Sequence, residues 1–509
     1  MLAAAAIALP LAVIGSGPAL ASTTHKLTVK VIDRSGQAGT STHVDLLNIG
    51  SNTDFHLGTT RQRNLRPGTY NVAAWIITGS GASATYTLAD QVIDLNASKT
   101  VVLDARQGKR VRLSLNNPAA QAEALEIAPL LNGEWAFNPT TIFPPAGRTY
   151  VVPMRSRLMR LYVYSVWERK GNTVADPSPF RYDIMRVYSG RIPASPVIST
   201  RTSQLASVDM TVRATAPGQQ ATLDLSPESS AGPGLPMNAT TTLGATPARL
   251  VSYRTPGWQW QPMVAWQTGA GFFRDWDLDQ AAIGAGRHSE DWGAAVFGPD
   301  ALNGPYASVF GRQLQTGESA FPMSDALHPS DEGTATQKFQ LYSGGKLLKK
   351  SAGASLNVKI PSATREYAFH LTATTPASDL STRVTGVWTF PAHGGGVLDH
   401  ASTWTYSLQW VARGLSARNQ AGSHSLTTVA LRAYPSTYPY PQLARTIKVW
   451  ASSNDGVTWH RVPVRTDGSQ YLISVRNSAT AGYTSLKVYL SDGHGHSEDL
   501  TVIHAYGVR

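Results

Sequence analysis

The chain has 509 residues, of which 15% are charged and 42% are hydrophobic, and it contains no cysteine. A chain of this length folds into about three or four domains, and the low charge together with 13 Trp, 19 Tyr and 12 Phe excludes general disorder. Without cysteine the fold cannot depend on disulfides, and cysteine nucleophiles and thiolate metal sites are excluded. The formal charge of +11 at pH 7 favours anionic partners, such as wall polymer, acidic polysaccharide or released nucleic acid, or else serves solubility.

The first residues have the pattern of an export signal. Residues 2–20 are apolar or small apart from Ser16, and Ala19-Leu20-Ala21 is a small-residue cleavage pattern. We therefore expect a signal peptide over residues 1–21, cleaved after Ala21, and a secreted mature chain of residues 22–509; a membrane anchor is the alternative. The basic segment usual in signal peptides is missing, because no Lys or Arg precedes Lys26. No later stretch is long and apolar enough to span a bilayer.

Residues 22–105 have the pattern of a small β-sandwich. Leu27, Val29 and Val31 alternate with polar residues, and further strand-like segments follow at 71–77, 91–95 and 100–103. The turn Leu65-Arg66-Pro67-Gly68-Thr69-Tyr70 leads into the segment at 71–77. This turn resembles the one that precedes a core strand in prealbumin-like or carboxypeptidase-regulatory-like modules, which implies a spacer or adhesion unit of about seven strands.

The rest of the chain alternates with period two as well, which predicts an all-β protein of tandem β-sandwich domains. We expect sandwiches over 106–245, closed by a linker at 226–236, and over 246–400, where Ser343-Gly344-Gly345 signals a hairpin. Residues 401–509 are expected to form an immunoglobulin-like sandwich. Its predicted strands are 447–451, 457–464, 471–475 and 484–490, with a turn at 454–456.

Six short phrases follow one another in the last two thirds of the chain: Phe180-Arg181-Tyr182-Asp183, Gly190–Pro193, Asp291–Pro299, Ser381–Phe390, Asn454–Trp459 and Ala505-Tyr506-Gly507. In content and order they resemble the long C-terminal region of secreted actinobacterial subtilisin-like serine peptidases, with the prealbumin-like module ahead of it. The resemblance implies a β-rich, non-catalytic region without the peptidase domain.

The catalytic motifs of such a peptidase are missing. A serine peptidase needs Asp, His and Ser in three separated segments, so that an oriented base meets the hydroxyl nucleophile. Asp33 lies in a phrase that resembles the Asp segment, and residues 39–43 match the Ser segment for three residues only. The gap between them is too short for a His segment, so we interpret both as structural turns and expect no enzyme and no catalytic residue.

Three other phrases resemble known sites. His393-Gly394-Gly395-Gly396 matches an oxyanion-hole string, but no nucleophile elbow accompanies it, so a loop is expected. Asp275–Asp279 spaces carboxylates as a calcium loop does, yet Gln280 and Gly286 stand where the bend and the bidentate acid belong. His494-Gly495-His496, near Glu498 and Asp499, is interpreted as a polar turn rather than a metal site. We expect no metal and no cofactor.

Four tryptophans are the binding candidates taken from the residues themselves. Trp258 and Trp260 lie two apart, so on one strand they face the same side, and Trp266 and Trp276 are near in sequence. Together they are candidates for a flat platform on which sugar rings stack. Packing between sheets is the competing interpretation, because tryptophans of β-sandwiches are mostly core residues.

These patterns favour a secreted, non-catalytic, multidomain β protein that binds or presents something at the cell envelope: wall polymer, polysaccharide or a protein partner. No motif for specific nucleic-acid binding occurs. One alternative is an accessory part or pseudo-form of a secreted subtilisin-like serine peptidase whose catalytic domain is on another chain. The other is an undescribed hydrolase that uses carboxylates on β loops.

Overall fold

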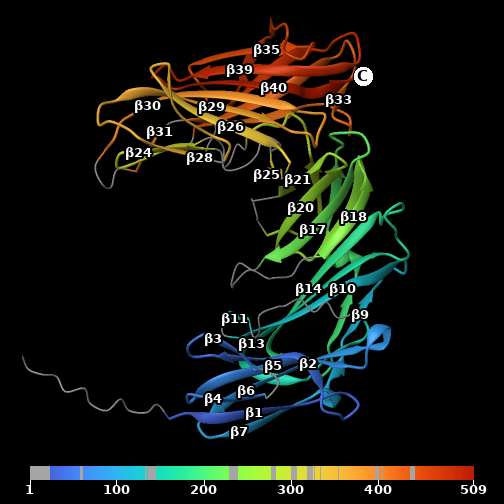
Figure 1. Ribbon diagram of the computed structural model, residues 1–509. Coiled ribbons are helices and arrows are strands. Elements are labelled where there is room, and N and C mark those ends of the chain that lie inside the picture. Colours follow the sequence, from blue (N-terminus) through green and yellow to red (C-terminus); the bar gives the residue numbers. More distant parts are fainter. Residues whose placement is uncertain are drawn as a thin grey trace, which may run out of the picture. The chain divides into compact units, whose positions relative to one another are not determined.

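A computed structural model of the chain (Figure 1) describes residues 23–57, 61–131, 134–135, 145–228, 239–276, 282–299, 306–317, 325, 327–332, 334–353, 355–395, 400–403, 405–435 and 442–509. The predicted signal peptide lies outside these residues. Within them the protein is all-β, as predicted, with 40 strands and three single-turn 3₁₀ helices, η1 Gly81–Ser83, η2 Ala105–Gln107 and η3 Thr202–Gln204. None of the described helices has the length and apolarity needed to cross a membrane.

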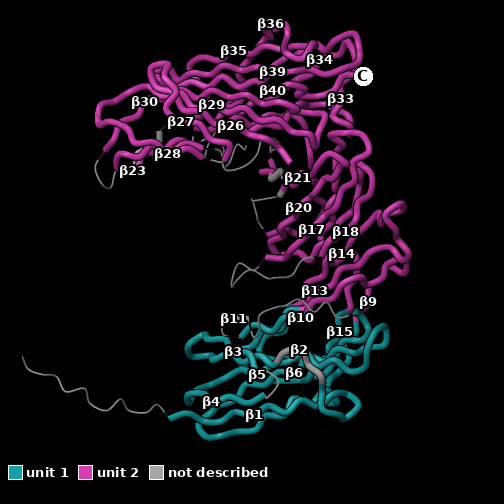
Figure 2. Tube along the Cα trace, in the orientation of Figure 1, with its two compact units in different colours: residues 1–112, 127–162, 187–198 teal, residues 113–126, 163–186, 199–509 magenta. Residues whose placement is uncertain are grey.

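The chain divides into two compact units (Figure 2). Unit 1 comprises residues 1–112, 127–162 and 187–198, and unit 2 comprises residues 113–126, 163–186 and 199–509. The division falls inside three strands, β10 Ala120–Leu131, β13 Met154–Arg169 and β14 Phe180–Ile192.

Unit 1 contains two sheets whose inner faces are apolar. The first has the order β4-β1-β7, with β4 Gln62–Leu65, β1 His25–Ile32 and β7 Lys99–Asp104. The second has the order β3-β2-β5-β6-β12-β8, with β3 Thr53–Leu57, β2 Thr40–Asn48, β5 Gly68–Thr78, β6 Thr85–Leu95, β12 Thr149–Val151 and β8 Lys109–Arg110. Alternate residues of β1 point inward, as predicted, so Leu27, Val29 and Val31 join Val72 and Ile76 in one core.

The turn before β5 is fixed by a tyrosine. Tyr70 is buried, and its hydroxyl donates to the Arg66 carbonyl at 2.9 Å, which closes the turn that the sequence predicted here. β5 then runs between β2 and β6 in the sheet.

A seven-stranded sheet contains the three strands that the division crosses. Its order is β11-β10-β13-β14-β19-β16-β22, where β11 is Glu134–Trp135, β19 Ala248–Arg254, β16 Ala206–Val212 and β22 Arg287–Trp292. A two-stranded sheet pairs β15 Val197–Thr200 with β9 Arg112–Leu115.

The other four sheets belong to unit 2. One has the order β18-β17-β20-β21-β25, with β18 Ala239–Ala245, β17 Gln220–Glu228, β20 Gln259–Thr268, β21 Gly271–Trp276 and β25 Ser330–Glu332. Another has the order β28-β24-β23-β31, with β28 Ser355–Lys359, β24 Gln313–Gly317, β23 Tyr306–Phe310 and β31 His400–Thr403.

The last two sheets form the terminal sandwich. The larger has the order β27-β26-β29-β30-β40-β39-β35-β36, with β27 Lys346–Ser351, β26 Thr336–Ser343, β29 Arg365–Thr374, β30 Arg383–Ala392, β40 Ser497–Val508, β39 Gly482–Ser491, β35 Thr446–Ser452 and β36 His460–Arg461; β33 Gln420–Ala421 also pairs with β40. The smaller has the order β32-β34-β38-β37, with β32 Tyr406–Ala412, β34 Leu426–Pro435, β38 Gln470–Arg476 and β37 Val464–Asp467. One continuous apolar core runs from Val208 to Val508 through unit 2.

The sheets cross the domain boundaries expected from the sequence. β8 and β12 complete a sheet of the module predicted to end at residue 105, and β19 pairs with β16 across the boundary at 245. Strands also pair across the boundary at 400, where β30 pairs with β40 from Arg383 opposite Ile503 to Thr389 opposite Ser497. Sequence alternation predicts strands well, but it does not say which strands pair over long distances.

Of the local predictions, the glycine hairpin is confirmed and one strand is wrong. Gly344 and Gly345 have φ of +55° and +74° and join β26 to β27, which confirms the predicted hairpin. The predicted strand 457–464 is wrong: Asn454 Oδ1 accepts the Thr458 N–H at 2.9 Å and holds a turn, so only short strands remain around Pro463. β17 extends to Glu228, so the predicted linker begins as strand, and its residues 229–236 lie outside those described.

A buried ion pair in unit 2 joins two sheets. Arg181 and Asp183 on β14 are both fully buried, with guanidinium–carboxylate distances of 2.8–3.0 Å. Arg181 also donates to the Leu223 carbonyl of β17 at 3.2 Å and to Thr241 Oγ1 of β18 at 2.9 Å. Tyr164 of β13 donates to Asp183 Oδ1 at 2.6 Å. Every charged atom of the pair thus has partners, so the network fixes how these sheets pack.

We predict that Arg181→Met destabilises unit 2 by about 3–5 kcal/mol, because it leaves the Asp183 carboxylate buried without its counter-charge. Urea denaturation followed by tryptophan fluorescence measures the loss. The double variant Arg181→Met with Asp183→Leu should recover most of it, since it removes both charges. A single variant as stable as the parent would show that the pair does not hold the sheets together.

Candidate functional site

Basic charge is concentrated in unit 1. This shorter unit contains 16 of the 44 Lys and Arg residues and 7 of the 33 Asp and Glu residues, which gives a formal charge of +9, whereas unit 2 contains 28 and 26, a charge of +2. Thirteen of the 16 basic side chains of unit 1 are exposed. Among the described Lys and Arg residues of unit 1, Arg106 is the one in an ion pair, with Asp104 at 2.7 Å; His56 lies 2.5 Å from Asp45.

Strand β13 presents the densest part of this charge. Arg155, Arg157 and Arg160, here called the arginine cluster, are all exposed within one strand. Arg155 and Arg157 are two residues apart, so they project from the same face with a spacing of about 7 Å. Arg191 of β14, the neighbouring strand in the sheet, is exposed as well. Strands keep these side chains at fixed spacing, as recognition of a repeating anion requires.

An acidic group of unit 1 adds little negative charge. Asp90 on β6 is buried, and burial raises its pKa to about 8, against a smaller lowering by the Asn71 amide beside it. Its carboxyl is therefore largely protonated at pH 7. The positive potential of unit 1 at neutral pH is accordingly at least as strong as the formal charge indicates.

Unit 2 contains a polar groove of about 810 Å³ on the outward face of β16, β19 and β22. Two ion pairs line or flank it: Arg213 with Asp291 at 2.6 Å, and Arg287 with Asp209 at 2.7 Å. Arg249 lies opposite Thr211 in the sheet register and also lines the groove. The groove therefore offers donors and acceptors of both signs without a net preference for anions.

A buried Asp–His pair lies at the edge of this polar groove. His328 lines the groove, stacks on Trp292 at 3.8 Å between ring centres, and has Nδ1 2.9 Å from Asp325 Oδ1. Burial raises the pKa of Asp325, but the His328 imidazole and the N–H groups of Leu327 and His328 outweigh it and hold that pKa below its usual value. A carboxylate orients a catalytic base in the same way. The His328 ring, however, is packed against Trp292 and forms part of the side of the polar groove.

Asp275 of β21 faces the interior beside Asp325. It is fully buried, and neither of its carboxyl oxygens has a hydrogen-bond partner among the residues that the structure describes. Burial and the neighbouring Asp325 charge raise the pKa of Asp275 well above its usual 3.8. A carboxyl in this position is held neutral, since ionisation would bury an unpaired charge next to another.

We predict that Asp275→Asn stabilises the protein at neutral pH. The pKa of Asp275 is higher in the folded than in the unfolded protein. Below about pH 4 the carboxyl is protonated in both states and costs no stability. The free energy of unfolding then falls as pH rises from there toward the folded pKa. The amide cannot ionise, so calorimetry should give the variant a Tm about 4 °C or more above the parent at pH 7.5 and an equal Tm near pH 4. A lower Tm for the variant at pH 7.5 would mean that a charged Asp275 is stabilised.

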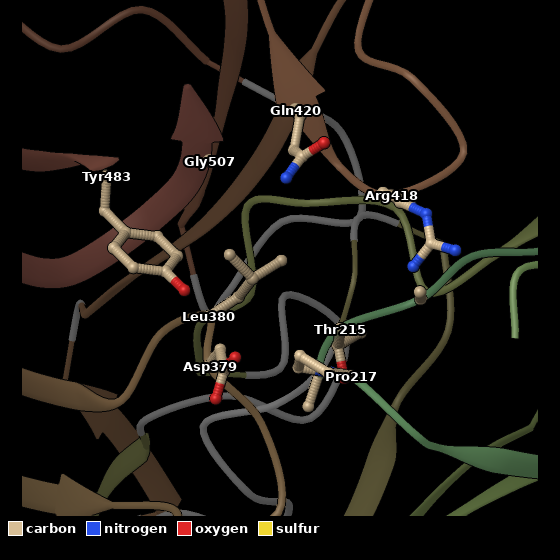
Figure 3. Close-up of a pocket in the computed structure, with 10 residues that line it drawn as sticks. Thr215, Pro217, Asp379, Leu380, Arg418, Gln420, Tyr483 and Gly507 are labelled. Atoms are coloured by element: carbon tan, nitrogen blue, oxygen red, sulfur yellow. The ribbon is translucent and has the colours of Figure 1, made fainter. Parts of the chain in front are cut away.

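A second cavity in unit 2 is much smaller. It has a volume of about 100 Å³, and Figure 3 shows Tyr483, Gln420, Arg418 and Asp379 around it. The Tyr483 ring stacks on His504 at 4.0 Å, and burial together with Asp379 raises the pKa of its hydroxyl. Ligand pockets usually measure about 300–1,000 Å³, so this cavity has room for a few waters only.

The structure does not assemble the tryptophan platform. Trp260 is 4% exposed and donates from Nε1 to the Thr255 carbonyl, and Trp266 is 0% exposed and stacks on Phe273. These two rings are core residues, so they cannot stack sugars. Trp258 lies half-buried in the turn before β20, and the Trp276 side chain lies outside the described residues. The two-residue spacing correctly placed Trp260 on a strand, but it could not tell which face of the sheet is inward.

The other candidate phrases have structural roles. The N–H groups of Gly394 and Gly395 donate to the carbonyls of Pro361 and Gly311 at 2.7 and 2.8 Å, so they form no oxyanion hole.

Asp33 Oδ1 accepts from the N–H groups of Ser35 and Gln37, which confirms a turn there. In the loop of His494 and His496, Asp492 accepts both backbone N–H groups, as in a polar turn. The calcium-like phrase beyond Trp276 lies outside the described residues. Where the chain is described, no three His, Asp or Glu side chains form a possible metal site.

Comparison with known proteins identifies no family. No protein-family model and no curated protein matches the chain. A solved mutated variant of three immunoglobulin-type titin domains is 11% identical, with 60% of this chain and 96% of that chain covered and a TM-score of 0.14. The TIE protein of Bacillus anthracis is 8% identical, with coverages of 75% and 74% and a TM-score of 0.11. Alpha-2-macroglobulin of Escherichia coli is 10% identical, with coverages of 96% and 53% and a TM-score of 0.14. Likenesses this low say nothing about function.

Proposed function

We propose that the protein is a secreted, non-catalytic, multidomain β protein that binds an anionic polymer of the cell envelope through unit 1. The observation that carries the proposal is the division of charge: +9 in unit 1 against +2 in the longer unit 2. Solubility alone needs no such concentration, because charge spread over the whole surface serves it equally well.

The electrostatics of unit 1 suit a polyanion. Exposed like charges repel one another and reduce stability, and a chain of phosphates or carboxylates relieves that repulsion by pairing with them. Binding of this kind releases counter-ions from the polymer and weakens steeply with salt. The arginine cluster adds geometry, since an arginine can hold a phosphate or carboxylate with two parallel hydrogen bonds.

The predicted signal peptide supports a location outside the cell, where wall polymers carry such anions. The resemblance to the accessory region of secreted peptidases supports a binding role as well, because that region lacks the catalytic segments. In this proposal unit 1 attaches the protein to the wall polymer.

The test is co-sedimentation of residues 22–509 with purified cell wall and with a neutral polysaccharide, at 50 and 500 mM salt. We expect pelleting with wall at low salt, loss at high salt, and none with the neutral polymer. Replacing the arginine cluster by Arg155→Gln, Arg157→Gln and Arg160→Gln should weaken binding by roughly tenfold or more at low salt.

The matched control removes the same charge from unit 2. Lys346, Lys349 and Lys350 are exposed on β27, so their replacement by Gln alters net charge equally. This triple variant should bind nearly as well as the parent. Equal losses in both triple variants would contradict a site on unit 1, and no pelleting at either salt would contradict wall binding and favour the alternative of a separate catalytic chain.

A further inference from the structure

The terminal sandwich has a groove between its two sheets. The groove measures about 530 Å³, within the usual range for ligand sites. β35 and β36 of the larger sheet form one wall, and the ends of β34 and β38 of the smaller sheet form the other. We call it the terminal groove.

The charged side chains of the terminal groove are all basic or imidazole. His460 and Arg461 on β36 and Arg476 at the end of β38 are exposed at its rim. No Asp or Glu lines it, and neither arginine forms an ion pair with a described residue. A positive rim without a neighbouring carboxylate attracts an anionic group.

The uncharged lining of the groove is part aliphatic and part polar, the polar part being Ser452, Ser453, Ser474, Asn477, Ser478 and Thr484. Ala451, Val462, Pro463 and Val475 line it, and Leu426, directly opposite Arg476 in the register, is 64% exposed at its edge. None of the lining residues is Trp, Tyr or Phe. Sugar sites usually rely on aromatic faces, whereas aliphatic walls suit the alternating side chains of an extended peptide.

An edge strand borders the groove. β36 ends its sheet, with β35 on one side and no described strand on the other. The backbone groups at such an edge can pair with an added extended chain. The positive rim, the aliphatic lining residues and the free strand edge of the groove therefore favour the same kind of occupant.

We propose that the terminal groove binds an extended acidic peptide segment of a protein partner, with aliphatic side chains against Val462 and Pro463 and carboxylates at Arg461 and Arg476. The site is in unit 2 and does not require wall binding by unit 1. Attachment through one unit and capture through the other would let the protein present a partner at the envelope.

The test uses residues 22–509 in solution, without wall material. The probes are dye-labelled, end-capped hexapeptides of alternating valine and glutamate or of alternating valine and lysine, followed by fluorescence anisotropy. We expect the acidic peptide to bind and the basic one not to bind. Arg461→Gln with Arg476→Gln should weaken binding by about tenfold or more, and Leu426→Glu, which adds a carboxylate at the exposed rim, should weaken it too.

Two controls separate this site from general charge and from unit 1. Arg413→Gln with Arg445→Gln removes two exposed charges of the terminal sandwich outside the groove and should leave binding unchanged. The triple replacement of the arginine cluster should also leave it unchanged. Equal binding of both peptides, equal losses in the groove and control variants, or competition by an acidic oligogalacturonide but no binding of the acidic peptide would overturn the proposal.

Discussion

Packing of paired sheets without any covalent link is the constraint on which this structure depends. A cysteine-free chain must hold its sheets by apolar cores and buried polar contacts. The Arg181–Asp183 ion pair is an example. Both charged side chains are buried in unit 2, and groups from β13, β17 and β18 form hydrogen bonds with them. Such a network tolerates little displacement, because any shift would leave a buried charge unpaired.

The same constraint separates interior from exterior charge. Asp90 and Asp275 are inside and held neutral by burial, whereas the three side chains of the arginine cluster are exposed. Burial therefore removes part of the negative charge from the protein surface, whereas the basic side chains remain exposed. In unit 1 this produces a surface whose positive charge is out of proportion to its size, and the rigid strand beneath it keeps the arginines at fixed spacing.

Sequence alternation predicted the all-β class, the turn closed by Tyr70 and the glycine hairpin at Gly344, because each depends on neighbouring residues only. It could not predict that β30 pairs with β40, since period two says nothing about partners more than 100 residues away. The sites followed the same rule. The Arg-x-Arg repeat at Arg155 and Arg157 is visible in the sequence, whereas the meeting of Asp275, Asp325 and His328 depends on tertiary structure. The tryptophan spacing left both a platform and core packing open, because inward and outward faces of a strand look alike in one sequence.

Anion binding by unit 1 is the central claim of this account. Arginine-selective chemical footprinting of residues 22–509, read by mass spectrometry with and without soluble anionic wall polymer, tests it most directly. The account predicts that Arg155, Arg157, Arg160 and Arg191 are protected by the polymer, and that protection disappears at high salt. Protection confined to arginines of unit 2, or protection that high salt does not reduce, would contradict it.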